Sequence, residues 1–231
     1  MSCLSSLCCC LQSHFSEEER QPILGAPESA RISHSPPNDS QHRNGRITVR
    51  RVGVPDLDQR FTDFEQTFNK QQEHYECMQE KWKTLMFRYR CAPDSSLSEC
   101  LQKIKDEHDD HQISLQMKGF DFSLAVTPDD PMPDKLKRTQ ENIKELCQAV
   151  KAIVAVGPKL EEMINWLLKS EKSLTKKVKE EAKTYLESKR LRDNLRENLH
   201  KASRAKDLSP RYREEAGKLL NEVAQLSGVE L

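Results

Sequence analysis

Four cysteines near the start of the sequence are the residues best suited to chemistry. Cys3 precedes three adjacent thiols, Cys8 to Cys10, in a segment, residues 1–15, that contains leucines but no acidic residue, lysine or arginine. Thiols beside apolar side chains suit thioester attachment of fatty acids, and two or more acyl chains anchor a protein stably where one does not. The cluster therefore predicts a lipoprotein that carries palmitate or a similar chain, and the candidate acylation sites are Cys3, Cys8, Cys9 and Cys10.

Two other interpretations of these thiols stay open. The segment is either a plain tail whose thiols have no role, or a ligand for a soft metal such as Zn²⁺ or Cu(I). Three adjacent cysteines lack the paired C-x-x-C spacing of a zinc site, so we assign no metal ligand and expect no cofactor.

A second group of metal-binding side-chain types is the sequence HDDH, in which His108 and His111 lie one helical turn apart. Two imidazoles at this spacing can share an ion, but a closed site needs further ligands that the sequence does not indicate. The chain also lacks the P-loop, dinucleotide-binding, nucleophile-elbow and H-E-x-x-H motifs. We therefore expect no enzymatic activity and assign no catalytic residue.

Composition favours a mostly helical protein. Of 231 residues, 32% are charged and only seven are glycine, whereas α/β enzymes use glycine in their turns. The formal net charge is zero, so the chain lacks the basic excess of a dedicated nucleic-acid-binding protein, and nucleic acid ranks last among its expected partners. Neither a secretory signal nor an apolar run of about 20 residues is present, which predicts a cytoplasmic protein, peripheral on the cytosolic face of a membrane, with free thiols.

Residues 16–54 are rich in Ser, Pro, Asn, Gln, Arg and His, with few large apolar side chains. Such a segment cannot bury enough apolar surface to offset the entropy of ordering, so it predicts a disordered tether. Ser35, which precedes Pro36, is a candidate phosphorylation site for a proline-directed kinase. The basic run 43–51 either contacts anionic lipid or is simply solvated.

The strongest periodic pattern lies in residues 56–90, where Asp56 and Gln59 resemble a capping box at the start of a helix. A helix of this length spans roughly 50 Å and cannot bury an apolar stripe against itself. The stripe therefore predicts an interaction surface for other helices, either from the same chain or across a homodimer. Its members recur at steps of four and three: Leu57, Phe61, Phe64, Phe68, Tyr75, Met78, Trp82, Leu85 and Tyr89.

The later apolar pattern predicts four more helices. Ser96 and Glu99 form an S-x-x-E capping box at the start of the second, which forms an antiparallel hairpin with the first. Gly157-Pro158 is expected to end one helix, and Ser209-Pro210 to start another that returns antiparallel. The four predicted helices are 96–119, 135–156, 159–206 and one from residue 209 onward.

A local excess of positive charge lies in the longest of these helices. Between Glu171 and Lys206 there are twelve Lys and Arg residues and six Asp and Glu residues, a surplus of six. A basic helix face can lie on an anionic membrane, although a solvated face with intrahelical ion pairs is the simpler interpretation. The candidate lipid-contacting residues are Lys172, Lys176, Lys179, Lys183, Arg190 and Arg196.

Together these patterns predict an all-α, antiparallel helical bundle with coiled-coil-like long helices, preceded by a disordered region. The expected function is that of a membrane-tethered scaffold or adaptor that binds other proteins through its helices. The alternative is a peripheral lipid-binding or membrane-shaping protein that uses the basic face. The expected segments are 1–15 for acylation, 16–54 for the tether, 55–119 for the helical hairpin, 120–133 for an irregular linker and 134–231 for the bundle.

Overall fold

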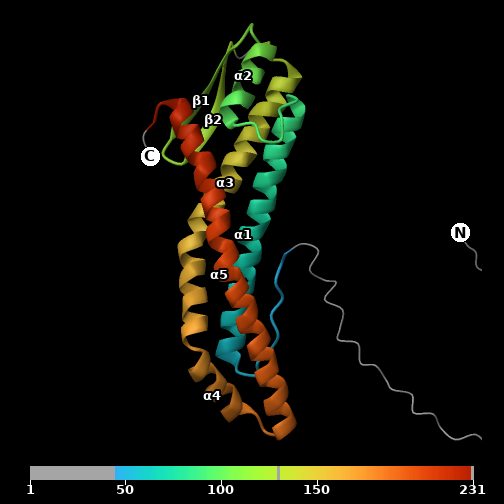
Figure 1. Cartoon of the computed structure of the whole chain (residues 1–231), viewed down its shortest axis with the longest axis vertical. Coiled ribbons are helices and arrows are strands. Elements are labelled where there is room, and N and C mark those ends of the chain that lie inside the picture. Colours follow the sequence, from blue (N-terminus) through green and yellow to red (C-terminus); the bar gives the residue numbers. More distant parts are fainter. Residues whose placement is uncertain (1–44, 129–130, 230–231) are drawn as a thin grey trace, which may run out of the picture. The chain divides into compact units, whose positions relative to one another are not determined.

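The computed structural model describes residues 45–128 and 131–229, which belong to one compact unit, residues 41–231. These residues form five helices and one two-stranded antiparallel sheet, so the protein is mostly helical (Figure 1). The expectation of an all-α fold is corrected by the sheet. The predicted acylation sites at Cys3 and Cys8 to Cys10, and Ser35, lie outside the described residues.

Helix α1, Pro55–Arg88, follows the predicted boundaries to within two residues. Apolar side chains at helical spacing form its buried face, on which Phe61, Phe64 and Phe68 are fully buried. The predicted capping box is wrong, because the N-cap is Val54, whose side chain forms no capping bond. Proline at the first helical position starts the helix instead, since its backbone nitrogen needs no partner there.

Helix α2, Leu97–Glu107, begins at the predicted capping box, in which Ser96 Oγ accepts from Glu99 N–H at 3.2 Å. It ends twelve residues before the predicted position at residue 119, and two strands follow it: β1, Gln112–Lys118, and β2, Asp121–Thr127. The strands pair antiparallel with Leu115 opposite Leu124. The predictions of a helix up to residue 119 and of an irregular linker from residue 120 are therefore wrong for the residues of β1 and β2.

Alternation of side chains explains the β-hairpin. Ile113 and Leu115 on β1, and Phe122, Leu124 and Val126 on β2, are buried, while Ser114, Gln116 and Ser123 are exposed. A period of two places every second residue on one face of a strand. Leu115 also lies four residues from His111, a helical step, which is why the sequence predicts a longer helix over residues 96–119.

Helix α3, Asp134–Lys169, continues through Gly157 and Pro158 without ending there, so the predicted break is wrong. A proline inside a helix costs about 3 kcal/mol because it removes a hydrogen bond and crowds the preceding turn. Ile153, Leu160 and Ile164 are buried on both sides of this point. Burial of one such side chain contributes about 1.5–3 kcal/mol, so tertiary packing outweighs the local cost.

The predicted helix 159–206 is divided among three observed helices. After α3 come α4, Glu171–Glu181, and α5, Tyr185–Ser227. Pro210 lies inside α5, so the predicted antiparallel return at Ser209-Pro210 is also wrong. Ala205, Ser209 and Tyr212 are buried on one side of α5 across the proline, which keeps the helix continuous against its neighbours.

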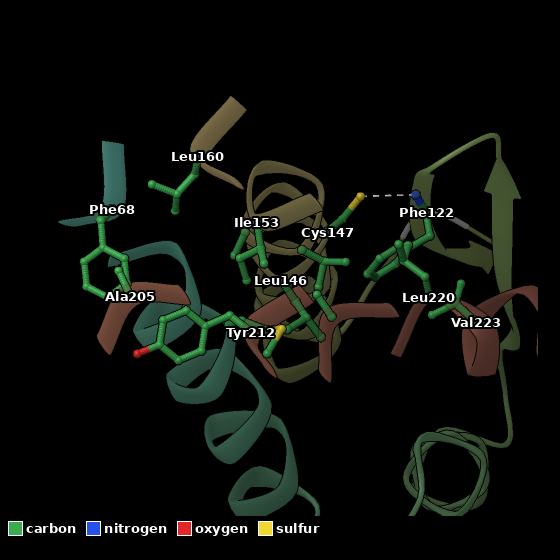
Figure 2. Packing of buried hydrophobic residues seen from close by; sticks show 14 of the residues in the cluster. Phe68, Phe122, Leu146, Cys147, Ile153, Leu160, Ala205, Tyr212, Leu220 and Val223 are labelled. Atoms are coloured by element: carbon green, nitrogen blue, oxygen red, sulfur yellow. Dashed lines mark hydrogen bonds between the residues drawn. The ribbon is translucent and has the colours of Figure 1, made fainter. Parts of the chain in front are cut away.

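The core lies where α3 packs between α1 and α5. Figure 2 shows Phe68, Ala205 and Tyr212 at one side of this core, with Leu146 and Ile153 of α3 between them and the hairpin. Cys147 Sγ accepts a hydrogen bond from the Phe122 N–H at 3.2 Å, which attaches β2 to α3 (Figure 2).

Residues 46–54, here called the N-terminal strap, lie extended against α1 and α5, although the sequence predicted a disordered tether up to residue 54. Ile47 and Val52 are buried. Asn69 exchanges two hydrogen bonds of 2.8 Å with the Ile47 backbone, and Asn198 bonds both backbone groups of Arg50 at 2.8 and 2.7 Å. Side-chain amides thus satisfy backbone groups that have no strand partner.

Candidate functional site

The predicted interaction stripe of α1 lies mostly in the core of the same chain. Leu57, Phe61, Phe64, Phe68, Met78, Leu85 and Tyr89 are buried. Tyr75 and Trp82 are only partly buried and reach the surface. The part of the stripe that can meet another protein is therefore confined to these two residues and their surroundings.

Tyr75 is held in one orientation by residues of α5. Its ring stacks on Tyr212 with centroids 4.1 Å apart and an interplanar angle of 20°, and its hydroxyl donates to Glu215 Oε2 at 2.7 Å. Burial, together with the hydrogen bond to the Glu215 carboxylate, raises the pKa of Tyr75 well above its usual value. The hydroxyl therefore stays a neutral hydrogen-bond donor.

A hollow of about 320 Å³ lies between α1 and α5, and we call it the α1–α5 groove. Its apolar lining comes from Met78, Trp82 and Leu219. Polar residues and charged residues of both signs surround this lining. They come from α1, from the turn before α2 and from α5: Gln79, Lys83, Ser95, Ser96, Glu215, Lys218 and Glu222.

Phe87 extends this surface along α1. Its side chain is 88% exposed, and it lines a second shallow hollow that shares Gln79 and Lys83 with the α1–α5 groove. Phe87 does not belong to the set of α1 positions that recur at steps of four and three residues. The sequence thereby indicates that the Phe87 side chain faces away from the buried side of the helix. Phe87 lies one helical turn from Lys83, which lines both hollows, whereas Trp82 is five residues away and faces a different way. An exposed aromatic side chain at the edge of a groove is typical of a protein-binding surface, where aromatic side chains carry much of the binding energy.

A larger hollow of about 560 Å³ lies between α1 and α3, where the Arg60 guanidinium sits 4.4 Å from the centroid of the Trp166 ring. Asp63, Lys159 and Glu162 also line it. The arginine charge is engaged by the aromatic face, and the remaining charges are of both signs. This hollow therefore indicates no class of ligand.

The two histidines considered as metal ligands contact different elements. His108 Nε2 lies 3.4 Å from the Tyr89 hydroxyl, and His111 Nε2 lies 3.3 Å from the Pro131 carbonyl. Burial, with a smaller contribution from Lys135, lowers the pKa of His108. Within residues 45–128 and 131–229, no three His, Cys, Asp or Glu side chains are grouped as metal ligands would be.

All six candidate lipid-contacting residues have exposed side chains. Three lie on α4, one in the turn after it and two in the first turns of α5: Lys172, Lys176, Lys179, Lys183, Arg190 and Arg196. Arg196 pairs with Asp193 at 3.1 Å, and Lys176 approaches Glu180 at 3.8 Å. These exposed pairs contribute little to stability.

Two apolar residues beside these cations were missed by the sequence-based interpretation. Tyr185 is 77% exposed and Leu186 is 76% exposed, at the start of α5. Leu191 and Leu195, which follow on the same helix, are buried. The step of five residues from Leu186 to Leu191 turns a helix by roughly 140° beyond one revolution, so the two leucines face different ways.

None of the helices in the described part of the chain is long and apolar enough to cross a membrane. The four cysteines within this part, Cys77, Cys91, Cys100 and Cys147, are free thiols. Comparison of the chain with protein families, with curated proteins and with solved structures found no match.

Proposed function

We propose that this protein is a non-enzymatic adaptor, tethered to the cytosolic face of a membrane, that binds a partner protein in the α1–α5 groove. The tether is the acylated cluster of Cys3, Cys8, Cys9 and Cys10, and no cofactor takes part. We also propose that α1, α3 and α5 pack as a bundle with coiled-coil-like contacts, which keeps the groove rigid.

The observation that carries the adaptor proposal is the exposure of Phe87 one helical turn from Lys83, which lines the α1–α5 groove. Large aromatic side chains contribute most to affinity when a partner covers them, and a groove between two helices suits the apolar face of a third. The hollow of about 320 Å³ has room for the apolar side chains of such a helix. Lys83, Lys218, Glu215 and Glu222 supply both signs of charge for the edge of the contact.

The test compares proximity labelling by the full chain in cells with labelling by the variant Phe87→Ser. The matched control is Phe120→Ser, because Phe120 is also exposed, at 55%, and does not line the groove. We expect a set of labelled neighbours to disappear with Phe87→Ser and to persist with Phe120→Ser. Identical neighbours for all three proteins would rule out docking at this surface.

The tether has a separate test. Acyl-exchange labelling and membrane fractionation are applied to the intact protein and to a variant with Ser at residues 3, 8, 9 and 10. We expect the labelling and most of the membrane-bound fraction to be lost together in the variant. Equal membrane recovery without labelling removes the acyl anchor from the proposal.

A second candidate function is direct, peripheral binding of anionic lipid or membrane shaping by the basic residues of α4 and the first turns of α5. The observation in its favour is that all six candidate cations have exposed side chains. Binding of this kind weakens as salt is added, because ions screen exposed charges. Nucleic-acid binding stays the lowest-ranked candidate, since the chain has no net positive charge.

A further inference from the structure

The corner between α4 and α5 exposes an apolar pair that is left uncovered by residues 45–128 and 131–229. Exposed large hydrophobic side chains in the described residues are Phe87, Phe120, Trp166, Tyr185 and Leu186, and only the last two are adjacent in sequence. They are the first two residues of α5. In Figure 1 this corner lies at the opposite end of the long helices from α2 and the β-hairpin.

Local hydrogen bonds and packing keep the pair outside. Thr184 Oγ1 accepts from the Glu187 N–H at 3.2 Å, and Glu187 Oε2 accepts from the Lys183 N–H at 2.9 Å, which fixes the start of α5. Leu174 and Val178 of α4, with Leu191 of α5, are buried on the inner side of the corner. The inward positions are thus filled by other side chains.

Positive charge surrounds the pair. Residues 176–190 contain six Lys and Arg residues and three glutamates. The Glu187 carboxylate already accepts the Lys183 N–H, and the contact between Lys176 and Glu180 is long and exposed. The basic residues are Lys176, Lys177, Lys179, Lys183, Lys189 and Arg190, and the side chains of all six are exposed.

We propose that this corner inserts Tyr185 and Leu186 into the interface of an anionic membrane while the surrounding lysines and Arg190 contact lipid headgroups. Tyrosine suits the headgroup level because its ring is apolar and its hydroxyl is polar, and leucine gains from entering the acyl boundary. Long basic side chains can extend to phosphate groups from around an apolar centre. An apolar centre with a surplus of positive charge complements a negatively charged surface that also has an apolar layer beneath it.

This inference rests on the second candidate function, lipid binding by the basic residues, and adds the part of the surface that enters the membrane. Charge alone predicts adsorption that disappears in high salt. Insertion predicts, in addition, a contribution that depends on two uncharged side chains, so the two can be separated by experiment.

The experiment uses the full chain with the substitutions Cys3→Ser, Cys8→Ser, Cys9→Ser and Cys10→Ser, so that no acyl chain on these thiols contributes. Sedimentation measures binding to two kinds of vesicle. One kind is phosphatidylcholine with about 30% phosphatidylserine, which gives a strongly negative surface potential, and the other is phosphatidylcholine alone. We expect binding to the anionic vesicles only, about tenfold or more weaker for the double variant Tyr185→Ser, Leu186→Ser. The control Phe120→Ser should bind like the parent.

A second measurement does not depend on loss of binding. In the variant Tyr185→Trp, tryptophan emission should move to shorter wavelength when anionic vesicles are added. The parent, which has only Trp82 and Trp166, is measured in the same way to give the contribution of these two native tryptophans. Unchanged emission overturns insertion at this corner.

The outcomes separate the two proposals. If the variant Lys183→Gln, Lys189→Gln, Arg190→Gln loses binding but the Tyr185→Ser, Leu186→Ser variant keeps it, lipid binding stands and insertion is overturned. If the parent binds no vesicles, both are overturned. If light scattering shows that the parent self-associates and that only the apolar double variant does not, the pair is a contact between copies of the chain, which also overturns insertion.

Discussion

A single glycine on α3 makes room for an arginine side chain of α5. Gly157 of α3 lies against the side chain of Arg213 of α5, and a Cβ at this position would overlap Arg213 Cδ. Arg213 in turn donates to Glu161 at 2.9 Å, one turn further along α3. The absence of a side chain at residue 157 thus allows an interhelical ion pair to lie across the α3 surface.

We predict opposite effects of alanine at two helical glycines. Gly217→Ala in α5 should raise the free energy of unfolding by about 0.5–1 kcal/mol, because alanine favours helix and a Cβ there meets nothing within 4 Å. Gly157→Ala should instead lower it by about 1–3 kcal/mol, because Arg213 must move. Urea unfolding followed by circular dichroism measures both, and equal stabilisation of the two variants contradicts the close approach.

His108 predicts how stability responds to acid. Its ring lies edge-on to Tyr89, with Glu107, Lys135 and His111 as the neighbouring titratable groups. Burial lowers its pKa in the folded state below the unfolded value of 6.5. The unfolded state therefore binds the proton more readily, so this contribution to stability is present above about pH 6.5 and is lost as pH falls through the folded pKa.

We expect His108→Gln to lose less stability than the parent between about pH 7 and pH 5, the range in which an ordinary histidine titrates. Urea unfolding at a series of pH values measures this difference. His200→Gln, at an exposed position on α5, is the matched control and should follow the parent. A steeper acid response in His108→Gln would contradict the assignment.

At the scale of elements, the N-terminal strap is the feature that depends most on distant side chains. Besides Asn69 and Asn198, Lys201 donates to the Thr48 carbonyl at 2.6 Å, and Asn194 donates to the Arg51 carbonyl at 2.8 Å. Buried Ile47 and Val52 add apolar contact. The strap is therefore attached to α1 and α5 by side chains rather than by a backbone ladder, which favours local release over global unfolding.

Replacing Asn198 should release the strap. Asn198→Ala leaves the Arg50 N–H and carbonyl without their partners, at a cost of about 1–3 kcal/mol. We expect faster hydrogen exchange at the Arg50 amide, with little change in the exchange of α3. Asn194→Ala, which removes one exposed hydrogen bond, is the control and should have a smaller effect. Unchanged exchange at Arg50 in Asn198→Ala would show that the two bonds do not hold the strap.

At the scale of the whole molecule, α3 and α5 cover the apolar stripe of α1 within one chain. A second copy is therefore not needed to bury the stripe. We predict that the full chain with Ser at residues 3, 8, 9 and 10 is a monomer of about 26.7 kDa by multi-angle light scattering at micromolar concentration. Twice that mass would mean that another surface joins two copies.

The sequence alone determined the features that depend on neighbours along the chain. The helix over residues 55–88 follows from steps of four and three, and the start of α2 follows from Ser96 and Glu99. The predominance of helix follows from composition. Each of these depends on local propensity, capping or periodicity, which a short window of residues contains.

The tertiary structure decided what depends on contacts between distant residues. Pro158 and Pro210 stay inside helices because buried side chains on both sides of each offset the local cost, and the strap is ordered because asparagines more than 20 residues away bond to its backbone. The same holds for the candidate surfaces. Phe87, Tyr185 and Leu186 are exposed because α1, α3 and α5 pack through other faces. The free energy of that packing depends on side chains that are far apart in the sequence, so no single segment predicts which faces become buried.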